Sequence, residues 1–454
     1  MKFIKYINDI AKLIEINIDR INSMNFPENI RYSMSTENIF ELTYEEYDLL
    51  EQIVEEISYD NNYGNEFPKN FIFDKLVREV IIKSYNIDSD INEIKFNLKS
   101  RFEEFESILN EEIKDWTYFI PISGIYVEDE INFESMTFYS FESFKMEVLD
   151  YLNNNHFVKD ELIYKKAIDS INKLKSFCFV KLVTRGTKET SKDKAINKVN
   201  ELLSIFSLYK PHDNNGFGIM GEVLPLNSEL ITYCFYENKL NTIRKRTVES
   251  RHFDLNENLD NMKNYYLNYL IELINKNELE EVEKKLLNSI QWYYESVKKE
   301  SLYEEEVIEV TLESNEYYEH HTYFKLGIRI INLISSLESL LIFNNTTNLE
   351  TRKKRFNLIM NYEKKEFYDY SDDLDELYDI RNDIAHSNKL YNLLKLNIVK
   401  NTYLIEMFII KFIEIKIAFD QDENKSLNTK EDLDKFYNGK NRLKNKFDYI
   451  NTLK

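Results

Sequence analysis

The chain has 454 residues, more than one ordinary hydrophobic core accommodates, which predicts two or three domains. With only 8 glycines and 5 prolines, tight turns are scarce, so long helices are favoured over a many-stranded sandwich. The formal net charge of -21 excludes a non-specific nucleic-acid coat protein, because such proteins are basic. Any contact with a polyanion must therefore be local.

The N-terminal region, residues 1–112, has the pattern of an acidic helical segment. Ile7, Ile10, Ile14 and Ile18 form one apolar stripe at helical spacing. A cluster of turn-forming residues at 60–68 separates this half from a second helical run, Phe71 to Leu109. No combination of residues here indicates catalysis.

The middle region, residues 113–255, is predicted to be a small α+β domain. Residues 116–127 and 131–141 are rich in β-branched and aromatic side chains, which favours strands. The further expected elements are a helix at Phe144–Leu152, a strand at Phe177–Val183, a helix at Asp193–Leu208, a loop with Gly216, Gly218 and Gly221, and a strand at Glu229–Tyr236. The glycines lack the spacing of a phosphate-binding loop, so an ordinary loop is expected.

From residue 256 to 425 the sequence predicts an all-helical domain, followed by a polar and peripheral C-terminal tail at 426–454. The expected helices are Val282–Lys299, Tyr323–Phe343, Thr351–Tyr362, Leu374–Ala385 and Leu390–Phe419. The fold class is therefore mostly α, with a helical bundle at the C-terminal end. The last of these helices is apolar on nearly all sides, which indicates either a dimer interface or a core helix covered within the chain.

Two further patterns bear on location. Cys178 and Cys234 lie far apart and exclude a disulfide framework, which favours a reducing, cytoplasmic location. The N-terminus carries charges throughout and lacks the apolar centre of a signal peptide. The most apolar stretch, residues 403–419, is interrupted by four charged side chains, so no membrane contact is expected.

The residues that point most clearly to chemistry stand in the sequence LYDIRNDIAHSNKLY, as Arg381, Asn382 and His386. A histidine that titrates near neutrality can accept or donate the proton of an RNA 2′-hydroxyl. A guanidinium can bind the neighbouring phosphate through two hydrogen bonds and stabilise the charge of a transition state. Asn382 can orient the phosphate or the imidazole. This chemistry needs neither a metal nor a cofactor, and none is expected.

Spacing alone does not establish this site. Arg246 and His252 fit the same loose pattern, but they lie in a segment without helical periodicity and are interpreted as a surface connection. His386 could also be a helix-end histidine that interacts with the last carbonyl groups. On an ideal helix Arg381 and His386 would lie roughly 140° apart, so the arginine side chain or a helix distortion must close the gap.

The region from Val282 to Phe419 resembles the Apea-like branch of the HEPN superfamily. The resemblance rests on the LE-x-LL run in RIINLISSLESLLIF, which includes Glu338, on the basic helix ETRKKRFNLIM, and on the R-N-x-x-x-H pattern in LYDIRNDIAHS. It implies an all-α bundle that forms a homodimer and brings two Arg/His pairs to one cleft. It further implies a metal-independent endoribonuclease of a toxin, abortive-infection or antiphage system, with an antitoxin or a phage-derived trigger as a candidate partner.

Under this interpretation the C-terminal domain cleaves single-stranded RNA to 2′,3′-cyclic phosphate ends, and residues 1–255 sense or restrain it. The alternative is a non-catalytic HEPN module that dimerises and binds. Glu338 lies on an apolar face and needs a partner, either Arg381 in a functional role or another base such as Arg329 in a structural one.

A local basic run could guide RNA to the motif, or it could be an ordinary solvated helix face. The residues concerned are Arg352, Lys353, Lys354 and Arg355. The adjacent His320 and His321 cannot share one helix face and lack a third ligand, so no metal site is expected.

Overall fold

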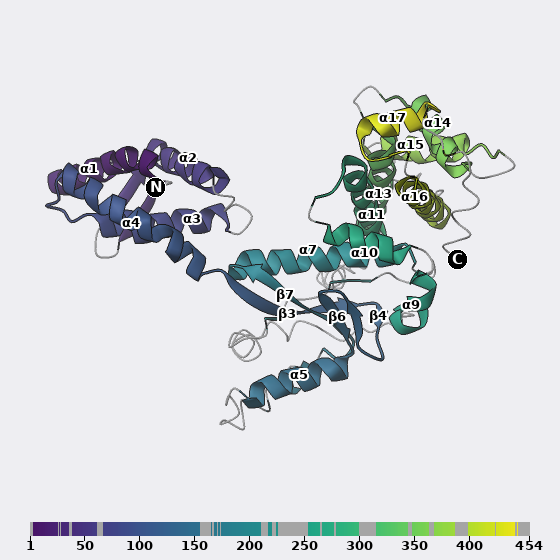
Figure 1. Cartoon of the computed structure of the whole chain (residues 1–454), viewed down its shortest axis with the longest axis horizontal. Helices are drawn as coiled ribbons and strands as arrows, with labels where there is room; N and C mark the ends of the chain where they lie inside the picture. The colour runs from purple at the N-terminus through teal and green to yellow at the C-terminus, as the bar shows by residue number, and fades with distance from the viewer. Residues whose placement is uncertain are drawn as a thin grey trace. The chain divides into compact units, whose positions relative to one another are not determined.

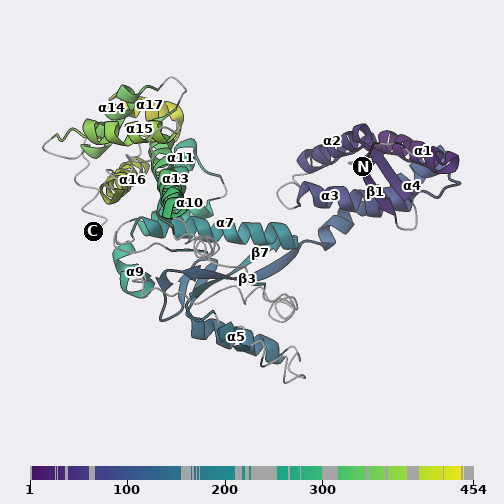
Figure 2. The same cartoon turned by 180° about the vertical axis from the view of Figure 1, so that it is seen from behind.

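A computed structural model describes residues 3–25, 27, 29–35, 39–60, 67–154, 165, 168–169, 171–172, 174–209, 217–219, 224–225, 253–263, 266–276, 278–298, 315–343, 347–362, 367–385, 398–422, 424–440 and 443. It confirms a mostly helical chain with a small sheet region (Figures 1 and 2). By internal contacts the chain divides into two compact units, residues 1–118 with 183–195, and residues 119–182 with 196–454. Among the described helices, none is both long and apolar enough to cross a membrane.

The N-terminal part of the first unit is built from helices around one apolar core. The bounds are η1 Ile4–Tyr6, α1 Ile7–Ser23, α2 Tyr44–Asp60, α3 Lys69–Lys75, η3 Leu76–Ile81, η4 Ile82–Ser84 and α4 Ile91–Glu111. The predicted stripe of α1 is buried, with Ile10 and Ile14 fully so. The predicted second helical run, Phe71 to Leu109, is divided between Ser84 and Ile91, and Asp90 starts α4 because its carboxylate accepts hydrogen bonds from the backbone N–H groups of Asn92 and Glu93.

The sequence predicts a helical N-terminal region, but the structure also contains two strands there. Strands β1 (Ile30–Ser35) and β2 (Ile39–Thr43) form an antiparallel hairpin. The hairpin is held by contacts that are distant in the chain, such as the hydrogen bond from the backbone N–H of Glu41 to the side-chain oxygen of Asn17 in α1. The first strand does alternate apolar and polar residues, as IRYSMS, but each strand is only five or six residues long, so the signal is weak beside the long helical runs around it.

The middle region contains the predicted α+β arrangement. Its elements are β3 Lys114–Ser123, β4 Ile125–Tyr126, β5 Ile131–Phe133, β6 Met136–Tyr139, α5 Phe141–Asn154, β7 Cys178–Gly186, α7 Lys188–Ser207, β8 Gly218–Ile219 and β9 Leu224–Pro225. The main sheet has the order β5-β6-β7-β3-β8, and β9 also pairs with β3. The predicted strand Glu229–Tyr236 lies outside the described residues, as do Gly216, Gly221 and Cys234.

Two helices cover opposite faces of this sheet. Phe138 and Tyr139 are consecutive in β6, so their side chains point to opposite faces. Phe206 of α7 packs against Phe138, with ring centroids 5.7 Å apart. Phe144 of α5 stacks at 3.7 Å on Phe179, the residue of β7 that pairs with Tyr139. Figures 1 and 2 show α5 and α7 on the two sides of the strands.

The C-terminal helices confirm the predicted elements, within three residues at each end except at two starts: α13 begins eight residues before the predicted Tyr323, and α16 is described only from Ile398, eight residues after the predicted Leu390. After β10 (Phe253–Asp254) follow α9 Leu255–Lys263, α10 Leu267–Asn275, α11 Glu281–Val297, α13 Asn315–Leu341, α14 Leu349–Met360, α15 Ser371–Ala385, α16 Ile398–Asp420 and α17 Lys430–Tyr437. Helices α11 and α13 pack closely, because Ser289 and Ser336 are small and each donates its hydroxyl to the other's backbone carbonyl at 2.8 Å. These bonds satisfy two polar groups that would be costly if buried alone.

Helix α16 is a core helix of this bundle. Its apolar side chains Ile405, Phe408, Ile409 and Phe412 are fully buried within one chain, and Phe408 stacks on Phe356 of α14 at 4.8 Å. Of the two interpretations of its all-round apolar sequence, the structure therefore supports the intramolecular one. The apolar surface of this helix no longer argues for a dimer.

The segment expected to be a peripheral tail belongs in part to the bundle. Leu433 and Phe436 of α17 are fully buried, and the Tyr437 hydroxyl donates to the carbonyl of Leu340 in α13. Thr429 and Asp432 cap the start of α17 reciprocally. The sequence appeared peripheral because α17 is short and only one of its faces is apolar.

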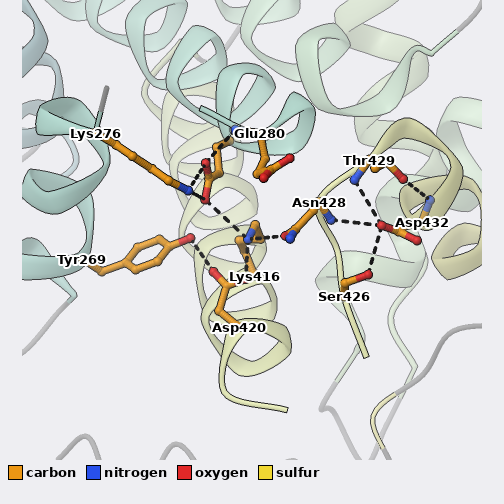
Figure 3. Close-up of polar contacts among 10 residues, drawn as sticks. Tyr269, Lys276, Glu280, Lys416, Asp420, Ser426, Asn428, Thr429 and Asp432 are labelled. Carbon is orange, nitrogen blue, oxygen red and sulfur yellow. Dashed lines mark hydrogen bonds and ion pairs between the residues drawn. The ribbon is translucent and has the colours of Figure 1, made fainter. Parts of the chain in front are cut away.

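A buried ionic network fixes this segment to the other helices (Figure 3). The ammonium of Lys416 in α16 is fully buried and contacts Asp420, the side-chain oxygen of Asn428 at 3.1 Å and Glu283 of α11 at 3.9 Å. Glu283 also accepts from Lys276 at 2.9 Å. Burial alone would raise the pKa of Glu283, but a backbone hydrogen bond and the two lysines lower it below its usual value.

Candidate functional site

Arg381 and Asn382 lie near the end of α15 and both are exposed. The helix begins with Asp372 and Asp373 in its first turn, which suits the positive end of the helix dipole. Among the described residues, the Arg381 guanidinium makes one long hydrogen bond, 3.5 Å from its Nη1 to the side-chain oxygen of Asn382. Within the described part of the chain, no carboxylate lies at ion-pair distance from Arg381.

The predicted partner of Arg381 is not placed. Helix α15 ends at Ala385, and His386 lies outside the described residues, so no Arg–His distance follows. The second Arg/His pair, Arg246 and His252, also lies outside them. Both the catalytic pairing and the choice between the two pairs stay predictions.

The end of α15 lies close against α13 at a glycine. A Cβ on Gly327 would stand 3.5 Å from the Cγ2 of Ile384, at ordinary van der Waals distance, so the space between the helices here fits an alanine but no much larger side chain. Ile331 lies one helical turn further along α13, on the same side as Gly327. Ile328 and Ile331 are 43% and 41% exposed, so the surface beside the motif is partly apolar.

Glu338 pairs with another base, as the structural alternative expects, but that base is Arg352 and not Arg329. Its carboxylate accepts a hydrogen bond at 2.6 Å from Nη1 of Arg352 in α14, rather than from Arg381 or Arg329. The pairing predicted with Arg381 is not observed, because Arg352 of α14 supplies the cation that pairs with Glu338. Glu338 therefore does not orient the Arg381 guanidinium directly.

The same arginine faces Tyr378 of α15. The guanidinium carbon of Arg352 stands 5.2 Å from the centre of the Tyr378 ring, within the range of a cation–π contact. Burial, together with the nearby Glu338 carboxylate, raises the pKa of Tyr378 to about 12, although Arg352 opposes this. Sequence analysis did not single out Tyr378. Its position one turn before Arg381 on the apolar face of α15 would have been the only indication.

The basic run on α14 is mostly engaged in the bundle. Lys353 pairs with Asp375 of α15 at 2.6 Å and with Glu350. Arg355 lies 4.5 Å from the ring centre of Phe343, donates to the carbonyl of Leu341 and pairs with Asp434. Of the four residues predicted to contact RNA, only Lys354 is exposed. RNA contact by this run stays a prediction, and three of its members already serve packing.

No family model, no curated protein and no solved structure matches the chain. Among the described side chains, no group of three or more His, Cys, Asp or Glu residues is arranged to hold a metal ion. The side chains of His320 and His321, at the start of α13, lie outside the described set.

Proposed function

We propose that the C-terminal helices form a HEPN-type endoribonuclease that cleaves single-stranded RNA without a metal, through Arg381 and His386, as part of a toxin or antiphage system. The observation that supports this most is the state of Arg381. It is exposed and has no carboxylate partner among the described residues, whereas Arg352, Lys353 and Arg355 in the neighbouring helix each have one. An exposed arginine with no carboxylate partner among the described residues suits a phosphate ligand.

The proposed reaction uses the RNA's own nucleophile. The 2′-oxygen forms a bond to the adjacent phosphorus, the bond from phosphorus to the 5′-oxygen breaks, and a 2′,3′-cyclic phosphate results. One base accepts the proton of the 2′-hydroxyl, and one acid donates a proton to the leaving 5′-oxygen. His386 fills one of these roles. Arg381 stabilises the charge that builds on the phosphate oxygens, and Asn382 orients them.

Two proton-transfer roles favour a second copy of the motif, which a homodimer would supply. Because α16 is covered within the chain, its surface is not the interface. The exposed Ile328 and Ile331, beside the end of α15, are the better candidates for a twofold contact that brings two motifs together. Under this proposal residues 1–255 sense a trigger or restrain the site.

The proposal is tested with purified full-length protein and a 5′-labelled single-stranded RNA. Wild-type protein should cleave it, and Arg381→Ala should not. Arg381→Lys should retain only part of the activity, because lysine keeps the charge but loses the two-pronged hydrogen bonding. Arg101→Ala, which removes an exposed arginine of α4, is the matched control and should cleave at the wild-type rate.

The outcomes also separate the enzyme from a binding module. If the wild type binds the RNA without cutting it, and Arg381→Ala weakens this binding, the chain is a non-catalytic HEPN-type module. If Arg381→Ala cleaves as fast as the wild type, the assignment of the site is wrong.

A further inference from the structure

Three side chains from three helices meet beside the proposed site, as one connected group. Glu338 of α13 accepts from Arg352 of α14 at 2.6 Å, and Arg352 lies against the ring of Tyr378 of α15 at 5.2 Å. Arg352 and Glu338 are about one-fifth exposed, at 21% and 23%, and Tyr378 is almost fully buried, at 4%. The group therefore lies at the edge of the core, where solvent screens its charges only in part.

This group is less stable than an apolar core of the same size would be. Neither the Nε of Arg352 nor the hydroxyl of Tyr378, both buried, has a hydrogen-bond partner of good geometry among the described residues. Buried polar atoms without partners are unfavourable, and apolar side chains of similar volume would fill such a position at lower cost. Local features that reduce stability in this way are typical of functional regions.

The group lies where it can set the orientation of Arg381. Tyr378 precedes Arg381 by three residues, and Ile384 follows it by three and lies against Gly327 of α13, so each is nearly one helical turn away. Tyr378 and Ile384 therefore fix the rotation of α15 on both sides of Arg381. A rotation or shift of α15 would turn the Arg381 guanidinium away from its exposed position.

We infer that Glu338, Arg352 and Tyr378 form a positioning triad that fixes the rotation of α15 and so presents Arg381 to the substrate phosphate. This inference rests on the proposed function, and it assigns the three residues no contact with RNA. It also assigns the LE-x-LL glutamate a role: Glu338 acts on the site through Arg352. The planar guanidinium links the carboxylate to the tyrosine ring, which a lysine ammonium would do less well.

The test compares variants of the full-length chain by two readouts, amide hydrogen exchange of α15 and the kcat and KM of RNA cleavage. Arg352→Met and Tyr378→Leu break the triad. Tyr378→Phe keeps the ring against Arg352 and serves as the conservative variant. Asp375→Asn is the matched control, because it removes the charge of the ion pair between Lys353 of α14 and Asp375 of α15 at a carboxylate that is 42% exposed, outside the triad.

In Arg352→Met and Tyr378→Leu, the amides of α15 around residue 381 should exchange faster than in the wild type. A displacement of about 1 Å at a reacting group can cost about 100-fold, so kcat should fall on the order of 10- to 100-fold while KM changes little. Tyr378→Phe should restore both values nearly to those of the wild type. Asp375→Asn should leave both unchanged. Should Arg352→Met fail to fold, Glu338→Gln is the milder variant and should change both values in the same direction.

Exchange of α15 at the wild-type rate in both disruptive variants would overturn the positioning role, whatever the activity. Faster exchange with an unchanged kcat would overturn it as well, because Arg381 would then not depend on the triad. A wild-type protein that cleaves no RNA would instead remove the proposed function, and the exchange comparison would still decide whether the triad holds α15.

Discussion

Replacement of Lys416 by methionine should destabilise the C-terminal helices strongly. Lys416 is fully buried in α16, and its ammonium contacts Asp420, Asn428 and Glu283. Methionine has a similar length and volume, so the substitution removes the charge without opening a large cavity. The carboxylates of Glu283 and Asp420 would then share one cation fewer.

The expected loss in the free energy of unfolding depends on the contacts that Glu283 and Asp420 keep without Lys416. Removal of one partner of a buried ion pair typically costs 3–5 kcal/mol, because the other charge is left without compensation. Here Glu283 keeps Lys276 at 2.9 Å, Asp420 is one-third exposed, and the Tyr269 hydroxyl still donates to Asp420 at 3.0 Å. These contacts place the loss at the lower end, about 3 kcal/mol in the free energy of unfolding.

The assay is urea unfolding followed by tryptophan fluorescence. The chain has two tryptophans, and Trp292 lies in α11, the helix that carries Glu283. In a Trp116→Phe background the fluorescence therefore reports this bundle. Lys435→Met is the control, because it removes an exposed ion pair with Glu431 and should leave the midpoint nearly unchanged. The double variant Lys416→Met with Glu283→Gln should lose less than the sum of the two single changes.

A midpoint for Lys416→Met that matches the Lys435→Met control would refute the reasoning. It would mean that water or a shift of α16 already compensates for the buried charges. Additive losses in the double variant would show that Lys416 and Glu283 do not interact, even if each matters by itself.

Four further predictions concern the site and the bundle. Arg381→Ala and His386→Ala should each abolish RNA cleavage with unchanged circular dichroism, since the pair acts as a unit, and a wild-type rate in either would contradict the assignment. Cleavage should persist in EDTA, leave 2′,3′-cyclic phosphate ends and spare DNA of the same sequence, whereas 5′-phosphate products would indicate a metal nuclease. Light scattering at micromolar concentration should give twice the chain mass, and a monomer would exclude the composite site. Folding lowers the pKa of Glu283, so its contribution to stability is present above its usual pKa of 4.5 and is lost as the pH falls through the pKa of the folded state. The free energy of unfolding of Glu283→Gln should therefore fall less steeply with decreasing pH than that of the wild type.

Local sequence was sufficient for the presence of five helices of the C-terminal region, although not for the start of α13 or for α17. Val282–Lys299 was predicted and Glu281–Val297 is observed, and Leu374–Ala385 became Ser371–Ala385. A long apolar stripe with capping residues at its start specifies a helix without reference to the rest of the chain. The α+β middle region was predictable for a related reason, since its buried strands are rich in β-branched and aromatic residues.

The sequence alone also singled out Arg381 as a candidate, and the structure adds that this arginine is exposed and has no carboxylate partner among the described residues. The partner of Glu338 was not predictable. Periodicity places Glu338 on a helix face, but which cation reaches it depends on how α13, α14 and α15 cross. The burial of α16 and the packing of α17 also depend on how the helices pack, which periodicity does not predict. Side chains that are distant in sequence meet only after the helices pack, and helix packing depends on the shapes of both surfaces at once.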